Sequence, residues 1–109
     1  MGKIIYSAIT WVDEDKELGK EYISWLVNEH LPELSLQPGF NSVKRIKLEE
    51  MNKNQWQGYQ IIMEIEKRED LETYFNSKSR KDAFIQIDKF SNVHHAERFF
   101  GELDIYLKK

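Results

Sequence analysis

The chain has 109 residues, of which 40% are hydrophobic and 32% are charged, and its formal net charge at pH 7 is −3. This length predicts one domain over residues 1–109, and the acidic balance disfavours nucleic acid as a partner because the protein would repel phosphate groups. The sequence has no cysteine, which excludes disulfides and thiolate chemistry. It also has no long apolar stretch, so we expect a cytoplasmic protein that does not bind membranes.

The first predicted elements are a strand over residues 3–12 and a long helix over residues 16–36. β-branched and aromatic residues fill the strand segment, and apolar residues recur at helical spacing in the helix segment. Pro32 cannot donate a backbone hydrogen bond, so the helix should bend or stop near His30. The sequence therefore places a titratable imidazole at a disrupted turn of the helix.

The second half of the chain predicts two more strands, a helix in two pieces and a final strand. Gln37-Pro38-Gly39 is a turn signal, and residues 49–55 are polar enough to form a hairpin loop. Gly101 lies in the last predicted strand, where its missing side chain predicts a bulge or a close contact. The predicted ranges are 40–48 and 56–66 for the strands, 69–76 and 80–90 for the helix, and 96–107 for the last strand.

The predicted order is β-α-β-β-α-β, which is typical of an α+β, ferredoxin-like fold with two helices on one face of a four-stranded antiparallel sheet. Alternation along the strands predicts which face is covered by the helices. The open face could meet water, or a second subunit could cover it. The covered set is Tyr59, Ile61, Met63, Ile65, Phe99, Leu103, Ile105 and Leu107, and the open set is Ser7, Arg45, Lys47, Gln60, Ile62, Glu64, Arg98, Phe100, Glu102 and Asp104.

Three features in this order of elements resemble the dimeric α+β barrel superfamily, nearest to EthD-like and related uncharacterised families. They are Trp25, the Glu29-His30-x-Pro32 step and Pro38-Gly39-Phe40. The resemblance implies a homodimer in which two sheets pack face to face, with a small-molecule pocket between sheet and helices in each subunit. Members include cofactor-free monooxygenases, polyketide cyclases, dehydratases, haem-degrading enzymes and proteins with no known activity.

The site residues follow from this resemblance and from side-chain chemistry. The place of His30 between Trp25 and Pro38 selects it as the catalytic acid and base, although it could instead donate to free carbonyls at the proline kink. Arg98 is the candidate anchor for an anion or carbonyl, because guanidinium binds carboxylates bidentately. Arg98 and the other charged residues of the open face could instead form an ordinary solvated surface or salt bridges between subunits. The predicted substrate-binding residues are Ser7, Trp25, Phe40, Arg45 and Arg98, of which the aromatic ones could equally be core or dimer contacts.

Several other site types have little support. His94 and His95 are adjacent and cannot chelate one ion together, so we expect no metal and no cofactor. An axial haem ligand could be proposed at His30 or His94, but no spacing selects either. No serine lies in a Gly-x-Ser-x-Gly elbow, which disfavours hydrolysis through a triad. Residues 57–62 echo an RNA-binding motif, but they lack its basic and second aromatic residues.

Two functions remain open from the sequence. The first is a homodimeric, cofactor-independent enzyme that acts on an aromatic or polyketide-like carbonyl compound, with His30 moving protons. The second is a non-catalytic dimeric module for ligand binding or assembly, because no complete catalytic constellation is visible.

Overall fold

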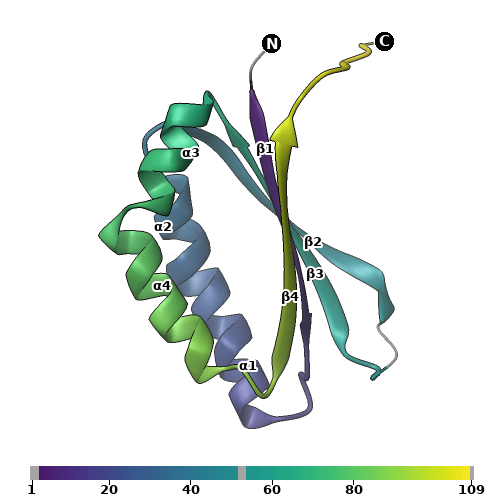
Figure 1. The fold of residues 1–109 in the computed structure, drawn as a ribbon. Coiled ribbons are helices and arrows are strands. Elements are labelled where there is room, and N and C mark those ends of the chain that lie inside the picture. The colour runs from purple at the N-terminus through teal and green to yellow at the C-terminus, as the bar shows by residue number, and fades with distance from the viewer. Residues whose placement is uncertain (1–2, 52–53, 109) are drawn as a thin grey trace.

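A computed structural model describes residues 3–51 and 54–108 and contains every predicted element in the predicted order. Figure 1 shows the strands as one twisted sheet and the helices as a layer against one of its faces. The elements are β1 (Ile4–Val12), α1 (Glu17–Trp25), the π-helical turn η1 (Leu26–His30), α2 (Leu31–Ser35), β2 (Phe40–Met51), β3 (Gln57–Ile65), α3 (Arg68–Phe75), α4 (Lys78–Lys89) and β4 (His94–Glu102).

The sheet has the strand order β2-β3-β1-β4, and all of its neighbouring strands are antiparallel. The first and third strands are therefore central, while β2 and β4 form the edges. This is the predicted ferredoxin-like α+β arrangement. None of the helices in residues 3–51 and 54–108 is long and apolar enough to cross a membrane.

The core lies between the covered face of the sheet and the helices. The predicted covered residues of β3 are buried, with exposed fractions of 5% or less at Tyr59, Ile61, Met63 and Ile65. Alternation in a central strand was sufficient to predict this face, because both of its neighbours are strands and only the helices can bury its side chains.

The predicted faces of β4 were wrong. Arg98 pairs with Ala8, and Phe100 pairs with Tyr6, so both lie on the helix-covered face, as does Glu102 opposite buried Ile4. Phe99 pairs with Ser7 on the open face and is 54% exposed. The apolar residues at 103, 105 and 107 suggested the opposite assignment, but the strand ends at residue 102 and these residues, like Asp104, lie beyond it.

Two further predictions from the strands were also wrong. In β2, Arg45 pairs with Ile61 and Lys47 pairs with Tyr59, so both share the parity of the covered face. Because β2 is an edge strand, their long side chains remain exposed. Gly101 lies in a continuous register, and a Cβ placed on it would meet nothing within 4 Å, so it marks neither a bulge nor a close contact.

The predicted disruption near His30 is confirmed, but the chain stays helical through it. The turn η1 is π-helical, and the N–H of Leu31 donates to the carbonyl of Leu26, five residues earlier. Pro32 follows at the start of α2, where a missing N–H is tolerated. After α2, Gly39 adopts a positive φ of 79° in the predicted turn.

The hairpin loop is shorter than predicted, because β2 continues to Met51. Residues 52 and 53 of the predicted loop lie outside the described residues. β3 begins at Gln57, next to Gly58, where a Cβ would collide with the Trp11 ring. A larger residue at position 58 would displace the Trp11 indole, which pairs with it on the open face of the sheet.

Candidate functional site

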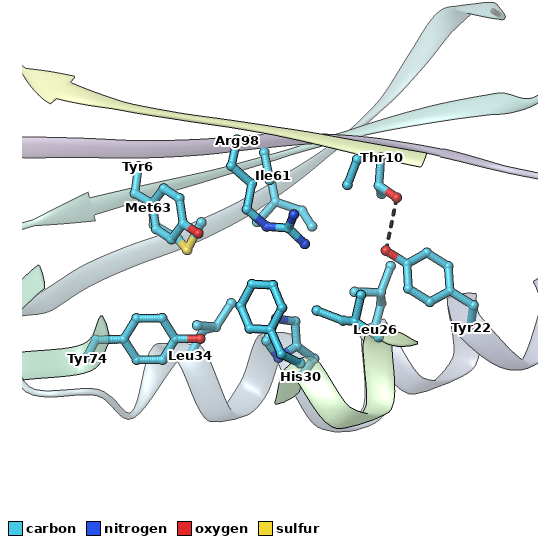
Figure 2. A pocket seen from close by; sticks show the side chains of 14 residues that line it. Tyr6, Thr10, Tyr22, Leu26, His30, Leu34, Ile61, Met63, Tyr74 and Arg98 are labelled. Carbon is cyan, nitrogen blue, oxygen red and sulfur yellow. Dashed lines mark hydrogen bonds between the residues drawn. The ribbon is translucent and has the colours of Figure 1, made fainter. Parts of the chain in front are cut away.

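A cavity of about 40 Å³ lies between the covered face of the sheet and the helices η1, α2 and α4. Its wall is mostly apolar, but one guanidinium, one imidazole and several hydroxyl groups face it (Figure 2). The lining residues are Tyr6, Ala8, Thr10, Tyr22, Leu26, His30, Leu34, Ile61, Met63, Tyr74, Phe84, Ile87, Ala96 and Arg98.

His30 comes from the last position of the π-helical turn. Its ring stacks on Trp25 with centroids 4.7 Å apart and an angle of 9° between the planes. Burial lowers the pKa of His30 to about 4, while Glu33 raises it slightly and Arg98 lowers it further. The imidazole is therefore neutral at neutral pH and can accept a proton.

Arg98 projects from the edge strand β4 over the cavity, and its guanidinium carbon lies 5.0 Å from the centre of the Phe84 ring. Within residues 3–51 and 54–108, no carboxylate lies within ion-pair distance of Arg98. Its positive charge acts on the cavity instead, because it lowers the pKa of His30, Tyr6 and Tyr22. Arg98 is the cation that an anionic group in this cavity would meet.

Hydroxyl groups lie at both ends of the cavity. At one end, the hydroxyls of Thr10 and Tyr22 are hydrogen-bonded to each other at 2.9 Å. At the other end, Figure 2 shows the phenol of Tyr6 on the sheet side beside Arg98, and the phenol of Tyr74 on the helix side next to Leu34. Burial raises the pKa of Tyr74 to about 12 and raises that of Tyr6, so both phenols are neutral hydrogen-bond donors.

The structure brings together only two of the predicted site residues, His30 and Arg98. Ser7 lies on the open face, where it accepts a 3.3 Å hydrogen bond from Gln60. Phe40 is a core residue packed edge-on against Tyr74, with ring centroids 5.3 Å apart. Trp25 supports His30 from outside the cavity, and Arg45 lies on the Tyr59 ring, 4.7 Å from its centre.

Among the polar and aromatic lining residues, sequence reasoning missed Thr10, Tyr22, Tyr74 and Phe84. Thr10 offered a signal, since it is a polar residue at a covered position of the first strand and is only 2% exposed. A buried hydroxyl needs a partner, which pointed to a polar group on the facing helix. Tyr74 and Phe84 read only as core residues, because their spacing is that of any amphipathic helix.

No group of three or more histidine or acidic side chains that could hold a metal ion occurs in the part of the chain that the structure describes. The cavity instead offers a neutral base, a permanent cation and phenol donors in apolar surroundings. Such a set can take a proton from a substrate and stabilise a negative charge that forms beside it.

Residues 3–99 match the family described as Domain of unknown function (DUF4286). The chain belongs to the DUF4286 family. No curated protein matches the sequence.

Solved structures show what this DUF4286 chain resembles in fold. A candidate antibiotic biosynthesis monooxygenase from Deinococcus radiodurans superposes with a TM-score of 0.76 at 11% identity, covering 97% of each chain. SnoaB, a cofactor-independent oxygenase from Streptomyces nogalater, superposes with a TM-score of 0.68 at 14% identity, covering 100% of each chain. An EthD family protein from Bacillus halodurans gives 0.66 at 14% identity, covering 93% of this chain and 99% of the other. The predicted resemblance to EthD-like α+β barrel proteins is therefore confirmed at the level of fold.

Proposed function

We propose that this DUF4286 chain is a cofactor-independent enzyme of the cyclase, dehydratase or monooxygenase type. Its substrate is a small aromatic or polyketide-like carbonyl compound, and His30 is its acid and base. The observation that supports this most is that a neutral imidazole and an arginine face the same apolar cavity, and that this arginine has no carboxylate partner among the residues the structure describes. The likeness in fold to a cofactor-independent oxygenase is consistent with it.

The proposed first step is removal of a proton from the carbon next to the substrate carbonyl. His30 takes the proton, the electron pair of the C–H bond forms the double bond of an enolate, and the negative charge moves to the carbonyl oxygen. Arg98 stabilises that oxygen with its positive charge and its N–H donors. His30 then returns its proton to the product.

The low pKa of His30 makes it a weak base in the empty site. A negative charge that forms beside the ring favours the imidazolium form and raises this pKa. The enolate oxygen held by Arg98 would supply that charge as the proton moves. His30 therefore becomes a stronger base only when a substrate lies between it and Arg98.

The cavity is small for an aromatic substrate. A volume of about 40 Å³ is room for a few water molecules, whereas ligand pockets typically measure roughly 300–1,000 Å³. Arg98 is exposed on an edge strand and rests on the partly buried Phe84 ring. We propose that these two side chains move apart to admit the substrate.

Proton exchange at a simple ketone tests the proposal. Nuclear magnetic resonance should show that the protein accelerates exchange of the methyl protons of acetophenone in deuterated water. His30→Ala should abolish the acceleration and shift the thermal midpoint by about 5 °C or less, while His95→Ala, at an exposed histidine outside the cavity, should change neither. A large loss of stability in His30→Ala, with no exchange activity in the wild type, would assign His30 a structural role.

A second candidate function is a non-catalytic dimeric module for ligand binding or assembly. The small volume of the cavity favours it, because the side chains around His30 leave little space. This module would bind no ketone and would give no exchange in the same experiment.

We also propose that the chain forms a homodimer through the open face of its sheet. A row of apolar side chains lies there, including Phe99 at 54% and Ile46 at 43% exposed. Groups of exposed large apolar side chains mark interaction surfaces, and the twisted sheet of a second copy is a complementary surface for them. The open-face apolar residues are Ile5, Ile9, Trp11, Ile46, Leu48, Ile62 and Phe99.

A further inference from the structure

The end of the cavity that holds Tyr6 and Tyr74 carries more positive charge than its lining suggests. Arg80 projects from the first turn of α4, and its guanidinium carbon lies 4.6 Å from the centres of both the Phe75 and the Phe84 rings. Arg98 lies on the Phe84 ring as well, at 5.0 Å. Both guanidinium groups therefore lie against the ring of Phe84.

Neither guanidinium is neutralised. In residues 3–51 and 54–108, neither Arg80 nor Arg98 has a carboxylate within ion-pair distance, and the buried Nε of Arg80 has no hydrogen-bond partner. The acidic group whose charge reaches this end is Glu33, which raises the pKa of Tyr74, but Glu33 is exposed and accepts a 2.5 Å hydrogen bond from Ser79. At Tyr74, the positive charges of Arg80 and Arg98 are thus opposed by the single exposed carboxylate of Glu33.

Two phenols complete this end. Tyr6 and Tyr74 are buried, at 6% and 5% exposed. Both guanidinium charges act on both hydroxyls, since Arg80 and Arg98 each lower the pKa of Tyr6 and of Tyr74. Neutral phenols beside fixed cations donate strong hydrogen bonds to an anion.

We propose that this end of the cavity binds the carboxylate of a small aromatic or apolar carboxylic acid. Arg98 and the hydroxyls of Tyr6 and Tyr74 contact the carboxylate, and Arg80 provides a second positive charge behind them. The apolar part of the molecule lies between Leu26 and Ile61, next to His30. A planar carboxylate matches a guanidinium in shape and charge, and it needs less space than a phosphate.

This inference rests on the proposed function, because it assigns the acid group of the substrate in the same cavity. A carboxylate held by one edge of the Arg98 guanidinium leaves its other N–H groups for the enolate oxygen, and leaves the rest of the substrate beside His30. The enzyme would therefore act on keto acids or aromatic acids in preference to neutral ketones.

Binding of a matched pair of probes tests the carboxylate. Fluorine NMR should show that 4-fluorobenzoate binds the full-length protein at least about tenfold more tightly than its neutral analogue 4-fluorobenzamide. Arg98→Gln should weaken benzoate binding by about tenfold or more, and Arg80→Gln by a smaller factor. The matched control is Arg68→Gln, which should leave binding unchanged, because Arg68 lies on the Phe100 ring at 5.5 Å and outside the cavity.

Tyr74→Phe keeps the ring and removes only the hydroxyl, so it tests the site even where an arginine variant fails to fold. It should weaken benzoate binding severalfold and leave benzamide binding unchanged. Equal affinities for benzoate and benzamide, no benzoate binding at millimolar concentration, or tighter binding of 4-fluorophenyl phosphate would each overturn the carboxylate assignment. So would an Arg68→Gln effect as large as that of Arg98→Gln.

The two proposals fail separately. If 4-fluoroacetophenone binds and exchanges its protons while benzoate does not bind, the carboxylate site is wrong and the proposed enzyme stands. If benzoate binds as expected and neither 4-fluoroacetophenone nor the keto acid 4-acetylbenzoate exchanges its methyl protons, the carboxylate site stands and the proposed catalysis is wrong.

Discussion

The surroundings of His30 determine its protonation state more than its own chemistry does. Burial is the largest effect and lowers its pKa; the negative charge of Glu33 opposes it, and the positive charge of Arg98, the smallest of the three effects, lowers the pKa further. The flat Trp25 ring covers one side of the imidazole. A protonated ring here would lose its solvation, so the folded protein favours the neutral form.

This leads to a prediction for stability against pH. The pKa of His30 falls from 6.5 to about 4 on folding, so the unfolded chain takes up a proton first as the pH drops. The contribution of His30 is therefore fully present above about pH 6.5 and is lost as the pH falls towards about 4, by about 2 to 3 kcal/mol.

Denaturant unfolding at about pH 7 and about pH 4.5 measures this loss. His30→Phe keeps an aromatic ring on Trp25 and cannot titrate. Between these two pH values, its free energy of unfolding should therefore fall by about 2 to 3 kcal/mol less than that of the wild type. His95→Phe, at the exposed neighbour of His94, should follow the wild type. Equal losses in the wild type and His30→Phe would show that the ring is solvated in the folded protein.

The π-helical turn η1 explains how one helix presents so many residues to the cavity. Tyr22, Leu26, His30 and Leu34 all line it and are spaced by four residues. In a regular α-helix this spacing drifts by about 40° per step, so the last residue would face away from the first. A wider turn between Leu26 and His30 reverses part of that drift.

A deletion tests this role of the wide turn. Removing the exposed Asn28 takes out one surplus residue, so the turn should become α-helical and the thermal midpoint should fall by about 5 °C or less. Removing the exposed Ile85 from the regular helix α4 should instead rotate one part of that helix by about 100° and unfold the protein or destabilise it by about 3 kcal/mol or more. A comparable loss of stability in both deletions would show that η1 cannot absorb the change.

The same elements show where sequence reasoning succeeded and where it failed. The faces of β3 were predictable, because a central strand is buried on the side where the helices lie. The faces of β4 were not, because an edge strand places Arg98 on the covered side while its guanidinium still reaches solvent. His30 was predicted from Pro32 and its neighbours, whereas Tyr74 and Arg80 come from a distant helix pair, and no local pattern links them to His30.

At the scale of the whole molecule, the sheet separates two surfaces for which we propose different roles. The cavity opens on the helix side, while the apolar open face is on the other side. The proposed dimer would therefore cover Phe99 and Ile62 without covering Arg98. Assembly and ligand binding can be altered independently.

Sedimentation at micromolar concentration measures the proposed dimer. The wild type should sediment as a dimer, and the double variant Ile62→Lys and Phe99→Lys should sediment as a folded monomer, because it buries two unpaired charges in the interface. Leu36→Lys is the matched control at an exposed leucine, 81% accessible, on the helix side, and it should remain dimeric. A monomeric wild type would refute the proposed assembly.

His30 separates two compartments of the same protein. One is the cavity between sheet and helices, and the other is an outer groove that His30 shares with Glu29, Glu33 and Asp82. An imidazole has two nitrogens and can gain a proton at one while releasing a proton from the other. In the proposed reaction, the proton that His30 takes from the substrate would therefore pass to solvent in the outer groove, and deuterium from the solvent would enter the product before the product dissociates.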